Sequence, residues 1–193
     1  MKAFEGFKSE ASNKFGPLPA GPYVAKIINV KIDGDEPDQQ LVLRLDVSEG
    51  PHEGYFVKRY NKDSGNQNAK YPARYKGDFK IRIPNEANKK AMYPDSDKSR
   101  FNDAIFRIEQ SNPGYHWDWN ELGLKGLTVG INMQEGEYNG APYTRIGRLE
   151  IAQDVRDGKV KTMPPRDARN NQQPVDEQSG FTKVEDQTEL PWF

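Results

Sequence analysis

A chain of 193 residues and 22.0 kDa, with a net charge of −1, is long enough for one domain with additional segments. Only 34% of the residues are hydrophobic and 30% are charged, and the mean hydropathy is −0.96, so we expect part of the chain to lie outside any packed core. The absence of cysteine excludes disulfides, thiol catalysis and cysteine metal sites, and no apolar run is long enough to cross a bilayer. These features predict a soluble, cytoplasmic protein.

The first part of the chain contains the clearest strand patterns. An N-terminal arm is expected over residues 1–22, because three prolines and two glycines between Gly16 and Pro22 prevent regular structure. Alternation of apolar and polar residues predicts one strand over residues 23–32 and a second over residues 41–48. After a turn, residues 55–60 are predicted to form a third strand.

The middle of the chain changes from strand to helix patterns. Residues 61–77 lack an apolar period and are predicted to form a long loop, and residues 79–83 are predicted to form a short strand. Apolar residues then recur at i, i+3, i+4 and i+7 from Phe101, which predicts an amphipathic helix. We expect this helix to begin at a cap near Ser96 or Asp97 and to end at residues 112–114.

A hairpin follows, with strands expected over residues 127–133 and 143–151 and a candidate edge strand over residues 156–162. Counted without the short stretch 79–83, the order is three strands, a helix and two strands, which is the element order of an OB-fold, a small and partly open barrel. We therefore predict a mainly β, OB-fold-like barrel with a long basic loop and a disordered acidic C-terminal tail. The domains would be an N-terminal arm (1–22), the OB-fold-like domain (23–152), a flexible linker (153–175) and an acidic interaction tail (176–193).

Residues 55–100 are the most basic part of the chain, with twelve Lys and Arg against five Asp and Glu. Seven rings lie between these cations: Tyr55, Phe56, Tyr60, Tyr71, Tyr75, Phe79 and Tyr93. Cations beside rings are typical of surfaces that bind single-stranded nucleic acid, where each stacked base contributes roughly 1–3 kcal/mol. A solvated basic loop beside an ordinary sheet, with several rings in the core, gives the same pattern, so this stretch alone leaves both interpretations open.

The last residues combine acidic and aromatic side chains. Residues 186–193, Asp-Gln-Thr-Glu-Leu-Pro-Trp-Phe, resemble the acidic C-terminal tip of single-stranded DNA-binding proteins of bacteria and their phages. The barrel portion resembles the phage-encoded members of this family at residues 18–23, 41–54, 125–130 and 138–140. The resemblance implies an OB-fold that coats single-stranded DNA during replication or recombination, and a tail that recruits replication proteins such as a polymerase, helicase or primase.

The candidate contact residues combine a cation or a ring with a position on the expected strands, loop or hairpin. For nucleic acid they are Arg44, Tyr55, Lys58, Arg59, Tyr60, Arg74, Tyr75, Lys80, Arg82, Tyr138, Tyr143, Arg145 and Arg148. For partner proteins they are Asp186, Glu189, Leu190, Pro191, Trp192 and Phe193.

Two assignments stay open at this point. In residues 55–60, strand alternation does not decide whether the face with Tyr55 and Arg59 or the face with Lys58 and Tyr60 meets a ligand. Trp117 and Trp119 form either a stacking platform or, as we prefer, a contact that fixes the helix to the barrel.

Catalytic functions have little support in the sequence. His52 and His116 have no companion ligands at metal spacing, and no Gly-rich loop for a nucleotide is present. We therefore expect no enzyme activity, no cofactor and no metal, and regard a metal-dependent nuclease as a remote alternative. The main alternative function is a replication or recombination adaptor whose barrel does not itself bind DNA. The oligomeric state stays open.

Overall fold

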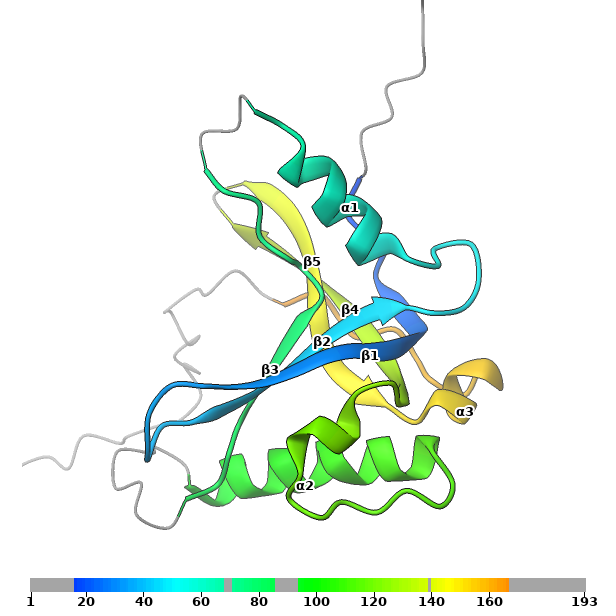
Figure 1. Cartoon of the computed structure of the whole chain (residues 1–193). Coiled ribbons are helices and arrows are strands. Elements are labelled where there is room, and N and C mark those ends of the chain that lie inside the picture. Colours follow the sequence, from blue (N-terminus) through cyan, green and yellow to red (C-terminus); the bar gives the residue numbers. More distant parts are fainter. Residues whose placement is uncertain (1–15, 68–70, 86–93, 139, 167–193) are drawn as a thin grey trace, which may run out of the picture.

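The computed structural model describes residues 16–67, 71–85, 94–138 and 140–166. Five antiparallel strands form one sheet in the order β3-β2-β1-β4-β5, which curls into a nearly closed barrel (Figure 1). The strands are β1 (Gly21–Asp33), β2 (Gln40–Val47), β3 (Asp78–Arg82), β4 (Thr128–Tyr138) and β5 (Ala141–Glu150). The helices are α1 (Tyr55–Ser64), α2 (Pro94–Ser111), the 3-10 helix η1 (Glu121–Leu124) and α3 (Ala152–Arg156). This architecture confirms the prediction of a mainly β, OB-fold-like barrel.

The leucine stripe of β2 points into the barrel, as its alternation predicts. Leu41, Leu43 and Leu45 are almost fully buried, and Leu45 lies opposite Ile27 of β1 in the antiparallel register. Because successive side chains of a strand point to opposite faces, Arg44 between these leucines lies on the outside of the barrel. The same alternation therefore places both the core and the outward-facing cations.

Helix α2 covers one end of the barrel, where it packs against β3, β4 and β5 (Figure 1). The residues of its predicted apolar stripe, from Phe101 to Ile108, are all buried. The helix begins at Pro94, two residues before the predicted cap, because proline suits the first turn of a helix. After its last turn, the Asn112 side chain donates to the Thr128 carbonyl (2.7 Å) and accepts from the Thr128 amide (3.0 Å), which ties the helix to β4.

Helix α1 replaces the predicted third strand over residues 55–60 and the start of the predicted loop over residues 61–77. The signal for this helix lies in another element, because its first turn is capped by Asp46 of β2. One Asp46 carboxylate oxygen accepts from the backbone N–H of Val47 (3.0 Å) and of Phe56 (2.8 Å). Burial raises the pKa of the Asp46 carboxyl, against the opposing effect of these hydrogen bonds.

Residues 152–166 belong to the folded domain, which corrects the predicted linker beginning at residue 153 and the predicted edge strand over residues 156–162. Residues 152–156 form α3, and residues 157–166 lie across the outer face of β4. The Asn132 side chain donates to the Lys161 carbonyl and the Gln134 side chain to the Pro164 carbonyl, both at 2.9 Å. None of the helices within the described residues is long and apolar enough to span a membrane.

Candidate nucleic-acid interface

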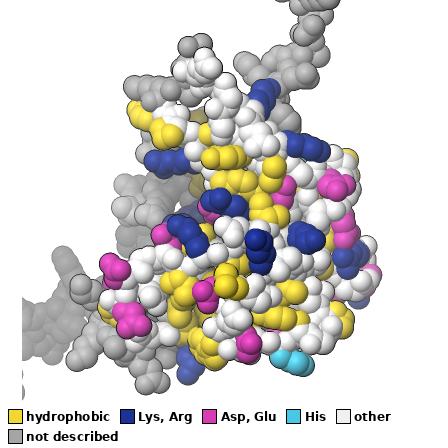
Figure 2. All heavy atoms as spheres, in the orientation of Figure 1, with side chains coloured by type: hydrophobic (Ala, Val, Ile, Leu, Met, Phe, Trp, Pro, Cys, Tyr) yellow, Lys and Arg dark blue, Asp and Glu magenta, His cyan; other side chains and the backbone are white. Residues whose placement is uncertain are grey.

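The outer face of β1, β2 and β3 gathers cations from three strands. In the register, Asn29 lies opposite Arg44, and Arg44 lies opposite Asp78; one step along, Lys31 and Lys80 flank Val42. We call this surface the basic face, defined by Lys26, Asn29, Lys31, Arg44, Lys80 and Arg82. Figure 2 shows a band of Lys and Arg side chains across the middle of this side of the molecule. Such a band attracts phosphate groups through a salt-dependent electrostatic interaction.

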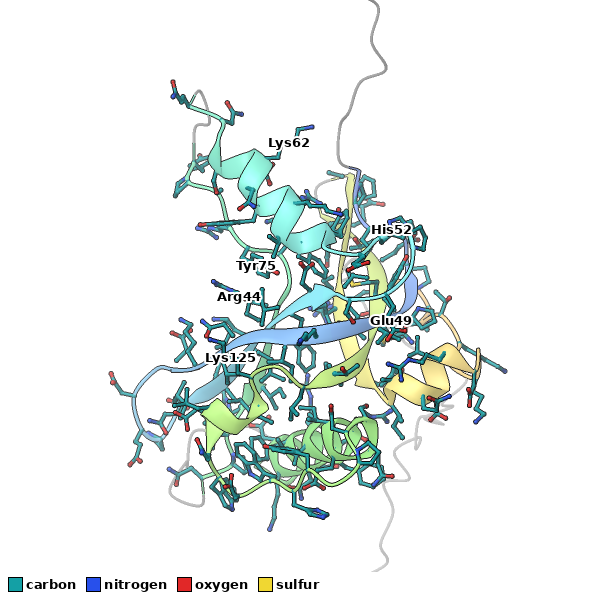
Figure 3. All side chains as sticks on the ribbon, turned by 45° about the vertical axis from the view of Figure 1, so that its right-hand side comes forward. Arg44, Glu49, His52, Lys62, Tyr75 and Lys125 are labelled. Atoms are coloured by element: carbon teal, nitrogen blue, oxygen red, sulfur yellow. The ribbon has the colours of Figure 1, made fainter. Side chains whose placement is uncertain are left out.

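Arg44 is the centre of the basic face and is held from two sides. Its Nε and one terminal nitrogen donate to the two Asp78 carboxylate oxygens at 2.9 and 3.1 Å. Its guanidinium carbon lies 4.7 Å from the centre of the Tyr75 ring, a cation–π contact that Figure 3 shows at the middle of the sheet. The hydrogen bonds to Asp78 raise the pKa of Arg44. The Arg44 side chain is still 40% exposed, so it is both fixed and accessible.

Tyr75 supports Arg44 from a half-buried position beside β2. Its hydroxyl donates to the Leu45 carbonyl at 2.8 Å, and its ring lies 5.8 Å from the Tyr60 ring in an edge-on contact. Burial is the main cause of a raised pKa for Tyr75, so its hydroxyl stays a hydrogen-bond donor at neutral pH. Arg44 covers one face of the Tyr75 ring, so this face is not open to a base. Tyr75 instead holds the Arg44 guanidinium, whose other side can stack on a base.

Of the rings predicted for base stacking, Tyr55 is in the core. It is 7% exposed, its hydroxyl donates to the Gly16 carbonyl at 2.6 Å, and the same oxygen accepts from Arg59 at 2.9 Å. A base therefore has no access to Tyr55. Tyr60 is 38% exposed and lies on α1, the helix that borders the basic face (Figure 1). Because residues 55–60 are helical, the question of which strand face meets a ligand no longer applies. Tyr55 and Arg59 are four residues apart and lie on the same side of the helix.

The remaining predicted cations of residues 55–82 lie around the basic face. Lys58 of α1 donates to the Glu53 carbonyl at 2.7 Å, and Arg74 is exposed in the segment before β3. Lys80 and Lys31 both contact Asp33, at 3.0 and 3.1 Å. These hydrogen bonds, with that from Lys80 the stronger, lower the pKa of Asp33 and keep it charged.

Arg82 lies on the same outer face at the far end of β3. Its guanidinium is 3.7 Å from Asp97 of α2 and 3.9 Å from Asp38. Arg82 therefore forms ion pairs with two carboxylates, both at long distances. This residue therefore links the basic face to the side of α2.

The predicted residues of the second hairpin lie on β5, at the opposite edge of the sheet from β3. Arg148 contacts the buried Glu150 at 2.6 Å, and Glu150 also accepts from Arg107 of α2 at 2.7 Å. Tyr143 packs on Gly136 of β4, where a Cβ would lie 2.6 Å from the ring. The structure does not bring these residues, or Arg145, next to Arg44. Tyr138 is paired with Ala141 through the backbone, and its side chain is outside the described part.

Sequence reasoning missed three cations that lie on β1 or next to it: Lys26 and Lys31 of β1, and Lys125 after η1. The signal for the first two is their outward position in β1, opposite Asp46 and Val42 of β2. Lys125 is brought to β1 by the next residue, because the Gly126 amide donates to the Ile27 carbonyl at 2.7 Å (Figure 3). This contact joins residues far apart in sequence, so no local pattern indicates it.

The two tryptophans behave differently from each other. Trp117 packs edge-on against Phe101 of α2 (6.3 Å) and is partly buried, as the preferred interpretation expects. Trp119 stacks on the same Phe101 ring at 5.8 Å with an interplanar angle of 12°, yet it is 66% exposed. Its backbone has a φ of 65°, a left-handed conformation that is unfavourable for a residue with a large side chain.

Several predictions fall outside the described residues, including all six candidate partner-binding residues of the tail, 186–193. In the described part of the chain, no group of three His, Cys, Asp or Glu side chains is arranged to hold a metal ion. His52 instead packs edge-on against Tyr23 at 5.7 Å. A scan against models of known protein families finds no match for this chain, and a search of curated proteins finds none either.

Proposed function

We propose that this barrel binds single-stranded DNA through the basic face, without strong sequence preference and without catalysis. The observation that carries the proposal is the Arg44 assembly. Asp78 takes the hydrogen bonds at one edge of the guanidinium and Tyr75 covers one of its flat sides. The exposed remainder of the group can stack on a base and donate from Nη1 to a phosphate.

The surroundings of Arg44 favour an unpaired strand over a duplex. The basic face lies on a strongly curved sheet and is bordered by α1, whereas duplex recognition needs an element that enters a groove or follows two backbones. Cations on β1 and β3 lie on either side of Arg44, so phosphates can follow the face while bases contact the Arg44 plane. Contacts of this kind tolerate any base, because every base has a flat face.

The acidic segment 176–193 is the proposed recruitment element. It carries five acidic residues against one lysine, and its last four residues are Leu-Pro-Trp-Phe. We propose that it binds replication proteins such as a polymerase, helicase or primase during replication or recombination, as the resemblance to phage-encoded proteins implies. The double substitution of Trp192 and Phe193 by alanine is expected to abolish binding to purified replication proteins and leave DNA binding unchanged. Unchanged protein binding would refute this part of the proposal.

The test of DNA binding is a fluorescence anisotropy titration of labelled oligo(dT) with the full chain at several salt concentrations. We expect the logarithm of the affinity to fall with the logarithm of the salt concentration, by about 0.7 for each phosphate contacted. A duplex of equal length should bind more weakly. Lys159→Ala is the matched control, because Lys159 is exposed after α3 and paired with Asp157 (2.8 Å). Absence of binding at low salt, also after the acidic residues of 176–193 are changed to amides, would refute the proposal.

A further inference from the structure

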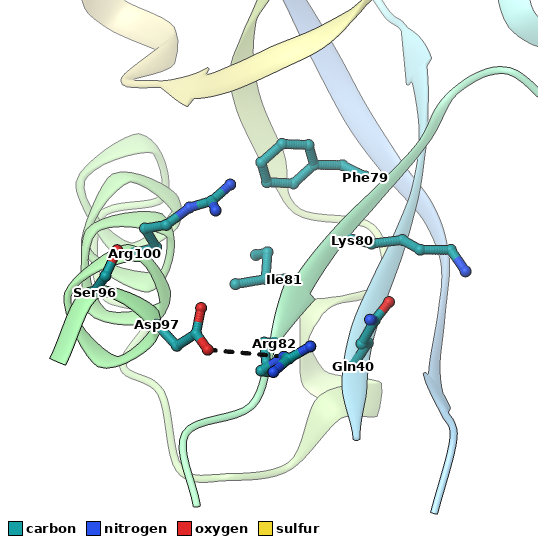
Figure 4. A pocket seen from close by; sticks show the side chains of 8 residues that line it. All are labelled: Gln40, Phe79, Lys80, Ile81, Arg82, Ser96, Asp97 and Arg100. Carbon is teal, nitrogen blue, oxygen red and sulfur yellow. Dashed lines mark ion pairs between the residues drawn. The ribbon is translucent and has the colours of Figure 1, made fainter. Parts of the chain in front are cut away.

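The barrel has a seam between β3 and β5, the two edges of the sheet, which are not paired with each other in the described residues. A cleft of about 380 Å³ lies at the β3 side of this seam, between β3 and the first turns of α2. Phe79 and Ile81 form an apolar wall, and Arg100 projects from α2 toward the Phe79 ring (Figure 4). Arg82 lies at the mouth with Asp97, so the cleft combines cations with an apolar surface.

Cations from three segments meet at this seam. Arg100 belongs to α2 and Arg145 to β5, and Arg166 is held on β4, where its amide donates to the Glu135 carbonyl at 2.8 Å. We call these three residues the seam cluster. Burial is the main cause of a lowered pKa for Arg145, and the positive charges of Arg166 and Arg100 lower it further, so Arg145 lies near both of the other cations.

Carboxylates lie near the seam cluster without pairing with it: Asp97 lines the cleft with Arg100, and Glu135 and Glu137 line a second pocket with Arg166. In the part of the chain that the structure describes, no carboxylate lies within ion-pair distance of Arg100, Arg145 or Arg166. Like charges held together without a directly paired counter-charge raise the energy of the free protein, and a bound anion lowers that cost. The arrangement is therefore suited to an anionic ligand.

We propose that a bound single strand continues from the basic face over the edge of β3 into the seam, where the seam cluster binds its phosphate groups. This inference rests on the proposed function and extends it to a second binding site. Lys80 and Arg82 connect the two sites, because both belong to the basic face and both line the cleft. The cations are spread over α2, β4 and β5, which suits a chain of phosphates better than one compact phosphate group. The Phe79 wall offers an apolar contact for a base or sugar.

The experiment compares labelled oligo(dT) of two lengths, about 6 and about 16 nucleotides, the range covered by one OB-fold. Arg100→Ala and Arg145→Ala are expected to weaken binding of the long strand several-fold and to reduce its salt slope by about 0.7 each. Binding of the short strand should change little. Lys98→Ala is the matched control, because Lys98 is exposed on the same turn of α2 as Asp97 and Arg100 but does not line the cleft. Arg100→Lys should restore the salt slope, and thermal unfolding of each variant checks its fold.

The outcomes separate this inference from the proposed function. If the unaltered chain binds neither strand, the proposed function fails. If it binds both, and Arg44→Ala weakens both while the seam variants behave like Lys98→Ala, the seam site alone is refuted. A nucleoside triphosphate that displaces the long strand at equal concentration would assign the cleft to a mononucleotide and would also overturn the inference.

Discussion

Replacing Arg44 by lysine separates the two contributions that we assign to this residue. Lysine keeps the positive charge and can reach Asp78, but it has no flat group to lie on Tyr75 or under a base. A stacked base contributes roughly 1–3 kcal/mol, so Arg44→Lys should weaken binding of oligo(dT) by about 5- to 150-fold. Because the charge remains, the salt dependence of binding should not change.

Arg44→Ala removes both contributions and serves as the comparison. It should lose at least as much affinity as Arg44→Lys and also lower the salt slope by about 0.7, the value for one phosphate contact. It also leaves Asp78 without the guanidinium at 2.9 Å. Since the pair is only partly buried, the stability cost should stay near 1 kcal/mol, which denaturant unfolding measures.

Anisotropy titrations of the three proteins at four salt concentrations give both affinity and slope. The reasoning is refuted if Arg44→Lys binds like the unaltered chain, because the flat group would then make no contribution. It is equally refuted if Arg44→Lys lowers the slope as much as Arg44→Ala, because lysine would then have lost the phosphate contact although it keeps the charge.

Three further predictions concern the fold around the site. Asp46→Ala removes the acceptor of two backbone amides and should lower the unfolding free energy by about 1–3 kcal/mol in denaturant titrations, whereas Asp46→Asn, which keeps an acceptor, should lose less. Glu49 is joined to Arg156 of α3 at 2.6 Å, and this pair lowers the pKa of Glu49. At pH values above the ordinary glutamate pKa of about 4.3, the pair should contribute up to about 1 kcal/mol to the unfolding free energy. This contribution should vanish as the pH falls through the lower folded pKa. The melting temperatures of the unaltered chain and of Arg156→Ala should therefore converge in acid. Trp119→Gly should be more stable than Trp119→Ala by about 1 kcal/mol, because both lose the stack on Phe101 but only glycine accepts the φ of 65° without strain.

Each of these has a clear contrary result. Equal unfolding free energies for Asp46→Ala and the unaltered chain would mean that Asp46 does not hold α1. A melting-temperature difference for Arg156→Ala that persists unchanged in strong acid would exclude the Glu49 ion pair as its cause. Alanine and glycine variants of Trp119 with the same stability would mean that the backbone at this position is not strained.

The sequence predicts those elements whose signals are local. The alternation of β2 and the helical spacing from Phe101 both depend on neighbours within one element, and both predictions are confirmed. Residues 55–60 follow a turn and are predicted to continue the meander as a strand, but they form a helix whose first turn donates a backbone hydrogen bond to Asp46 of β2. The placement of residues 157–166 depends likewise on side chains of β4, so composition alone suggests a linker there.

The candidate site likewise combines residues with a local sequence signal and residues that only tertiary contacts bring to the site. Arg44 can be identified from the sequence because it faces away from the leucine stripe, a pattern that one strand contains. Tertiary contacts determine the rest of the site, and no local pattern indicates them. They place Tyr75 against Arg44, Lys125 beside β1 and Arg100 at the seam. The basic stretch 55–100 is continuous in sequence, but the fold distributes it over α1, β3 and α2.

The position of residues 157–166 also limits how a ligand can travel around the molecule. Their backbone occupies the outside of β4, and Met163 lies so close to Gly147 of β5 that a Cβ there would be 2.8 Å from its sulfur. A ligand on this side therefore meets residues 157–166, including Arg166, and not the surface of β4 itself. On the proposed path, a strand would contact the sheet directly only from β1 past β2 to β3.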